Sequence, residues 1–113
     1  MAEQTNALAD ASPLARRLYN GLLAALRTLG PFREEVKKTS IHLARASAFA
    51  GVRFGRQHLL LTLKAAEPIS SPRVARNEQV SRNRWHVEVK LITAQDIDAQ
   101  LLGWLQQAYD LCA

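Results

Sequence analysis

The strongest constraint in this sequence is an alternation of apolar and polar residues that runs from Trp85 to Ile92. Large apolar residues occupy every second position and polar residues lie between them, in the order Trp85, His86, Val87, Glu88, Val89, Lys90, Leu91. Successive side chains of a β-strand point to opposite faces of the sheet, so this pattern predicts a strand with one buried face. We expect it to be a central strand.

Two earlier segments repeat the pattern. Lys37–Ala44 and His58–Lys64 both alternate apolar and polar residues, although Leu60 adds an apolar group to the polar side of the second segment. Phe49–Val52 is a brief apolar run closed by Gly51 and Gly55, and it predicts a short strand or a bulged extension. From Ala65 to Arg84 the apolar content collapses, and we expect a long loop there.

One amphipathic helix is expected at each end of the chain. Ser12 followed by Pro13 is typical of a helix start, and Gly30 with Pro31 is typical of a helix end. Thr93 with Asp96 resembles a capping box before a second apolar stripe that ends near Cys112. Each helix has one apolar face, so both can cover the same side of an antiparallel sheet. The sequence therefore predicts a two-layer α+β fold with three to five strands and one helix-free sheet face.

The length of 113 residues fits a single domain, which we place at residues 12–113 after a flexible tail at residues 1–11. Cys112 is the only cysteine, so no disulfide forms within the chain, and we expect it to act as a small apolar residue of the last helix. The N-terminal residues resemble neither a signal peptide nor a membrane span. These features predict a cytoplasmic protein.

Basic residues are concentrated in the middle of the chain. Residues 33–90 hold twelve Lys and Arg against five Glu, within a net charge of +5 for the whole chain. Arginine suits phosphate because its planar fork makes paired hydrogen bonds, so nucleic acid or another polyanion is a candidate partner. The alternative is a solvated basic surface without a specific ligand. The candidate contacts are the loop residues Arg73, Arg76, Arg82 and Arg84, with Lys37, Lys38, Arg45, Arg53 and Arg56 as helpers.

Three histidines share the polar side of the predicted strands. His42, His58 and His86 could meet on the helix-free face, where three imidazoles could hold zinc, but their spacing is not that of a metal motif. We therefore predict no metal and no cofactor. A small-molecule pocket between sheet and loop is the alternative to the polyanion site, with the lining Ser40, His42, Phe49 and His86.

No catalytic residue is predicted. Ser40 near His42, and Ser81 near His86, have no orienting acid or oxyanion hole in the pattern, and the sequence carries no phosphate-binding glycine loop. Leu60 and Ile92 fall on the helix-free face and favour a homodimer through that face. The alternative is that the long loop folds back over them.

Several stretches together resemble a bacterial family of domains of unknown function, DUF5655. They are LYNGLLAALRTLG from Leu18, the segment from Lys37 to Glu67, the strand WHVEVKLI and the closing QQAYDL. The likeness covers residues 14–112, and its markers are Lys38, Ile41, Phe49, Ala108 and Tyr109. Members occur alone or attached to other domains, some of them predicted nucleases. The resemblance implies a binding or accessory module and brings no functional residues.

A more distant likeness is to frataxin-like iron chaperones, which share the order helix, sheet, helix. Those proteins bind iron through acidic residues on and near the first helix. Here that helix carries Arg16, Arg17 and Arg27, and no acid lies between Ser12 and Phe32. Iron binding of that kind is therefore disfavoured.

Overall fold

The computed structural model describes residues 6–113. Within these residues the chain forms one antiparallel sheet of six strands in the order β1-β2-β3-β4-β6-β5, together with three α-helices. The elements along the chain are α1 (Ala7–Asp10), α2 (Pro13–Arg27), β1 (Arg33–Val36), β2 (Ile41–Ala44), β3 (Ala48–Phe54), β4 (Leu59–Ala65), β5 (Val74–Ser81), β6 (Arg84–Leu91), the short 3-10 helix η1 (Ala94–Asp96) and α3 (Ala99–Leu111).

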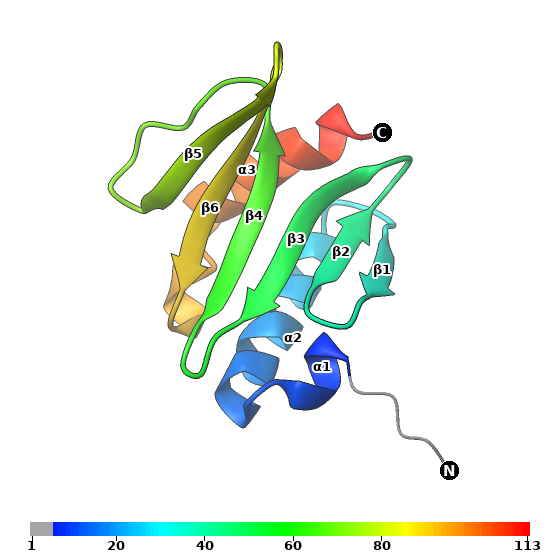
Figure 1. The fold of residues 1–113 in the computed structure, drawn as a ribbon, viewed down its shortest axis with the longest axis vertical. Coiled ribbons are helices and arrows are strands. Elements are labelled where there is room, and N and C mark those ends of the chain that lie inside the picture. Colours follow the sequence, from blue (N-terminus) through cyan, green and yellow to red (C-terminus); the bar gives the residue numbers. More distant parts are fainter. Residues whose placement is uncertain (1–5) are drawn as a thin grey trace.

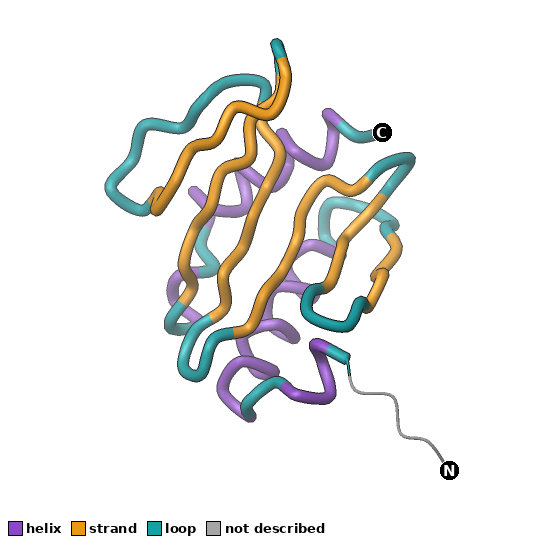
Figure 2. Tube along the Cα trace, in the orientation of Figure 1, coloured by secondary structure: helices purple, strands orange, loops and turns teal. Residues whose placement is uncertain are grey.

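Both long helices, α2 and α3, lie behind the sheet in Figure 1, so they cover the same face. In Figure 2 the strands lie in front wherever they overlap the long helices. The expected α+β arrangement with helices on one face is therefore confirmed. The other face of the sheet, which we call the open face, is turned toward the viewer in Figure 1.

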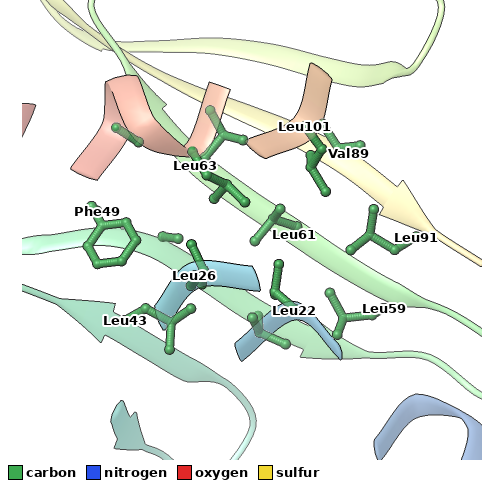
Figure 3. Close-up of a cluster of buried hydrophobic side chains, with 14 of the residues drawn as sticks. Leu22, Leu26, Leu43, Phe49, Leu59, Leu61, Leu63, Val89, Leu91 and Leu101 are labelled. Atoms are coloured by element: carbon green, nitrogen blue, oxygen red, sulfur yellow. The ribbon is translucent and has the colours of Figure 1, made fainter. Parts of the chain in front are cut away.

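The core lies between the sheet and the two long helices. Leu22 and Leu26 of α2 meet Leu61 and Leu63 of β4 there, as Figure 3 shows, and all four are essentially inaccessible to solvent. The alternation predicted for the strands is confirmed, because β4 buries every second residue from Leu59 to Ala65. Each fully buried Leu contributes roughly 1.5–3 kcal/mol through removal of apolar surface from water.

The helix starts follow local capping chemistry. The Ser12 hydroxyl accepts a hydrogen bond from the Ala15 amide at 3.1 Å, as the Ser-Pro pair predicts. The capping box of Thr93 and Asp96 is present, but it begins η1, and α3 has its own N-cap, Asp98. Cys112 is buried at the end of α3, as expected for a small apolar residue.

The prediction of three to five strands was too low because two edge strands were missed. Arg33–Val36, expected to be a connection, is β1, and Val74–Ser81, expected to be part of a loop, is β5. Every residue of these two strands is at least partly exposed, so neither strand has the apolar alternation that reveals a strand in the sequence. The strand Arg84–Leu91 is paired on both sides but lies second from one edge.

The first predicted strand is shorter than expected, since Lys37–Ser40 forms the turn between β1 and β2 and pairing begins at Ile41. The run Phe49–Val52, expected to be a short strand or a bulged extension, is part of the longer strand β3. The register between β2 and β3 shifts between Leu43 and Ala44, which leaves Phe49 without a register partner on β2.

The N-terminal segment differs from the expected tail within the residues described. Ala7–Asp10 forms a helical turn, and the buried Ala7 donates its amide to the Lys37 carbonyl at 3.0 Å. Residues 1–5 of the predicted tail lie outside the described residues. No helix between residues 6 and 113 is long and apolar enough to cross a bilayer.

Candidate ligand-binding site

The open face of the sheet contains a shallow hollow of about 430 Å³. Its residues come from five neighbouring strands and from the turn before β2, and they form three rows across the sheet. Each row consists of residues that lie opposite one another on neighbouring strands. The Arg53 row contains Arg53, Leu60 and Lys90, and Lys90 lies just outside the hollow. The Gly51 row contains His42, Gly51, Thr62, Glu88 and Arg76, and the Lys64 row contains Lys64, His86 and Glu78.

Gly51 and Thr62 form the floor of the hollow. Gly51 lies directly between His42 and Thr62 in its row and adds no side chain. A Cβ built at this position would have no neighbour nearer than 3.9 Å, so the space above the backbone is free. The missing side chain, together with the short side chain of Thr62 beside it, leaves a depression in an otherwise continuous face.

The floor opens further where β3 and β4 separate. Their pairing ends at Ala50 and Leu63, so Lys64 is paired with His86 of β6 and with no residue of β3. Phe49 borders the hollow at this point, but its side chain is fully buried and packs edge-to-face on Tyr109, with ring centres 5.3 Å apart. Phe49 therefore shapes the fold under the hollow and offers no ring to a ligand.

The charges in the hollow divide into paired and unpaired groups. Arg76 lies 2.7 Å from a carboxylate oxygen of Glu78 and 3.9 Å from one of Glu88, so both acids share one arginine. Among residues 6–113, Arg53 and Lys64 form no ion pair. The unpaired charge that lines the hollow is thus positive and lies on β3 and β4.

Three of the four residues predicted for a small-molecule pocket line this hollow with exposed atoms. Ser40, His42 and His86 are there, whereas the side chain of Phe49 is not accessible. Of the segment predicted as a loop, Arg76 and Glu78 line the hollow but belong to β5, and none of residues 66–73 lines it. That segment runs beside β5, where the Asn77 side chain accepts from the Ile69 amide and donates to the Ile69 carbonyl, both at 3.0 Å.

The nine cations predicted for a polyanion site are not brought together. Arg53 and Arg76 line the hollow, Lys37 and Lys38 lie in the turn between β1 and β2, and Arg56 lies in the turn between β3 and β4. Arg82 and Arg84 are at the opposite end of the sheet order, around the turn between β5 and β6.

Besides Arg76, two more of the nine cations make close contacts within the protein. Arg73 donates to both carboxylate oxygens of Asp98, at 2.8 and 3.0 Å, and this hydrogen bond helps to lower the pKa of Asp98 below its usual value, after the larger effect of the Leu101 amide. Arg45 lies over the Tyr109 ring, 3.9 Å from its centre, and donates to the Tyr109 carbonyl. Neither guanidinium is free to bind a phosphate without losing these partners.

The three histidines do not form one site. His42 and His86 are separated by three strand spacings and two residues of register, which places their Cα atoms about 16 Å apart. The His58 ring lies over Gly55 in the turn between β3 and β4. Across residues 6–113, no three His, Cys, Asp or Glu side chains are grouped as metal ligands.

The alternation of side chains along β4 and β6 contained information about the hollow that the sequence prediction did not use. Thr62, Lys64 and Glu88 lie on the polar side of strands whose faces the alternation had already assigned, and all three line the hollow. What the alternation does not give is the strand order that aligns Gly51 with Thr62.

The family model described as "Domain of unknown function (DUF5655)" matches residues 4–112. The chain belongs to this family. The match covers nearly the whole chain, so the sheet, both long helices and the hollow lie within the DUF5655 domain. No curated protein and no solved structure matches the chain.

Proposed function

We propose that this DUF5655 domain is a binding module that takes a small anionic molecule in the hollow of its open face. The observation that carries the proposal is the placement of two unpaired cations, Arg53 and Lys64, on either side of a floor made by Gly51 and Thr62. Ligand sites typically enclose roughly 300–1,000 Å³ and orient their ligand through a few polar groups.

An anion fits the charges better than a cation does. Glu78 and Glu88 are the acids of the hollow, and both already have Arg76 as partner. A cationic ligand would have to displace that arginine, whereas an anion meets Arg53 and Lys64 without breaking an ion pair. Charged hydrogen bonds to a carboxylate or phosphate are about twice as strong as neutral ones.

A small ligand is also favoured over single-stranded nucleic acid. Sheets that bind single strands stack the bases on exposed aromatic rings. In this sheet Phe49, Phe54 and Trp85 pack against the core, and no Phe, Tyr or Trp side chain of the described strands points from the open face. The scattered cations give no continuous track for a phosphate backbone.

The predicted homodimer through the open face stays a prediction, and the charges argue against a tight one. Two-fold pairing would bring Arg53, Lys64 and Lys90 of both copies onto one interface, and like charges at an interface oppose association. Sedimentation velocity at low and high salt tests it. A dimer that strengthens with salt would support pairing by the Leu60 surface, and a monomer at both salts would exclude it.

The test of anion binding is an NMR titration with inorganic phosphate, followed by amide shifts in a 15N-labelled sample. We expect the largest shifts at Arg53 and Lys64 and at Gly51 and Thr62 between them, and loss of these shifts in the double variant Arg53→Gln, Lys64→Gln. The matched control is Arg82→Gln, Arg84→Gln, which removes the same charge from the turn between β5 and β6.

Retention of binding in the control and loss in the hollow variant would support the site. Equal weakening in both variants would show that phosphate responds only to net charge, and the proposal would fall. A single-stranded DNA pool that binds the parent tightly, and whose binding is lost in the control variant, would instead favour the predicted polyanion surface.

A further inference from the structure

The hollow has two cationic ends and a middle without unpaired charge. Arg53 and Lys90 belong to the row at one end, and Lys64 belongs to the row at the other end. The row between them contributes Gly51 and the Thr62 hydroxyl, together with the Glu88 carboxylate that Arg76 already neutralises. Positive charge therefore flanks the floor of the hollow.

The spacing of the rows separates these ends by more than one small anion can cover. Neighbouring rows are two residues apart, so the Arg53 and Lys64 rows are four residues apart along β4, or about 13 Å at 3.3 Å per residue. A separation of this size exceeds the reach of one carboxylate or one phosphate.

The floor between the ends suits a narrow connecting segment. Gly51 leaves the backbone open, Thr62 supplies a hydroxyl that donates or accepts, and Leu60 is a half-buried apolar neighbour on the Arg53 side. A linear molecule lying over Gly51 and Thr62 would contact all three without displacing a protein side chain.

From this geometry we infer that the ligand carries an anionic group at each end, one held by Arg53 and the other by Lys64, with its middle over Gly51 and Thr62. The inference rests on the proposed function and narrows its ligand to elongated dianions. Two linked contacts bind more tightly than one because the second is made at high effective concentration, provided that the linker spans both sites.

The experiment is a calorimetric titration with straight-chain dicarboxylates from butanedioate to dodecanedioate, beside monocarboxylates of the same lengths. We expect affinity to pass through a maximum at an intermediate length, where the dicarboxylate binds at least tenfold more tightly than its monocarboxylate partner. Arg53→Gln or Lys64→Gln alone should reduce the dicarboxylate to the monocarboxylate level, since either variant removes one end.

Gly51→Val tests the path between the ends without changing any charge. The backbone at Gly51 has no positive φ and the added Cβ has no close contact, so the variant should fold normally. Its methyl groups would occupy the floor and should lower the affinity of the best dicarboxylate about tenfold. Unchanged affinity in this variant would overturn the inferred path.

The failures of the two proposals are distinguishable. If phosphate binds in the hollow but dicarboxylates of every length match their monocarboxylates within twofold, the site holds a single anion and the two-ended inference is refuted. If neither phosphate nor any carboxylate shifts the amides of the hollow, both proposals fail.

Discussion

Gly30 and Tyr109 are in contact where the end of α2 leads into the sheet. Their contact predicts that substitutions at the two positions have non-additive effects on the free energy of unfolding. Gly30 has a φ of 142°, a conformation that L side chains rarely adopt. The Tyr109 hydroxyl donates to the Pro31 carbonyl at 2.8 Å. A Cβ on Gly30 would overlap that hydroxyl oxygen and would lie 3.3 Å from the ring carbon that bears it.

The perturbation is a double-mutant cycle of Gly30→Ala and Tyr109→Phe. Gly30→Ala alone should cost about 3 kcal/mol, because backbone strain of roughly 1–3 kcal/mol is added to the overlap with the hydroxyl. Tyr109→Phe alone should cost about 1–2 kcal/mol, since it removes one hydrogen bond and leaves the Pro31 carbonyl to water. The ring contacts of Tyr109 with Phe49 and Arg45 remain.

In the double variant the overlap is largely relieved because phenylalanine lacks the hydroxyl. The double variant should therefore be more stable than the sum of the single costs implies, by on the order of 1 kcal/mol. The assay is equilibrium unfolding in urea, followed by tryptophan fluorescence, with the free energy of unfolding extrapolated to water. Additivity within about 0.5 kcal/mol, or a neutral Gly30→Ala, would refute this account of the junction.

Three further predictions concern the core, the acidic turn and the long connection. Leu61→Ala should cost about 3–5 kcal/mol in urea unfolding because it leaves a cavity under the sheet, and Leu60→Ala, on the open face, should cost clearly less. The pKa of Asp96 is lowered mainly by the amides of Ile92 and Thr93, so its stabilisation is present above about pH 4 and is lost as pH falls through the lowered pKa. Asp96→Asn should accordingly destabilise at pH 7 and approach the parent in acid, and a constant difference between pH 7 and pH 3 would contradict the assignment. Arg73→Lys should increase hydrogen exchange in residues 66–73, because lysine cannot reproduce the paired contacts with Asp98, whereas Arg82→Lys should leave that segment unchanged.

Most of the fold follows from patterns that individual residues display. The alternation from Trp85 to Leu91 assigned one face of β6 to the core, and Val87 and Val89 are buried. Ser12 and Pro13 begin α2 as their chemistry predicts. These features are local, since a side-chain period or a cap depends only on residues close in sequence.

The candidate site was predicted in part. Ser40, His42 and His86 were assigned to the open face from strand parity, and they line the hollow. Of the two cations on which the proposal rests, Arg53 was predicted only as a helper residue of a polyanion site, and Lys64 was not predicted as a site residue. The alternation along a strand assigns each side chain to one face of the sheet, but it does not determine which strand lies beside it.

The sequence by itself determined the two long helices, the strands that bury one face, and the side of the sheet that each of their residues occupies. Tertiary structure decided what depends on pairing between distant segments. Val74–Ser81 became a strand because β6 offers it hydrogen-bonding partners, although its exposed residues carry no apolar period. The same pairing aligned Gly51 with Thr62 and set Arg53 and Lys64 at opposite ends of one hollow, because cross-strand register is fixed only when the whole sheet forms.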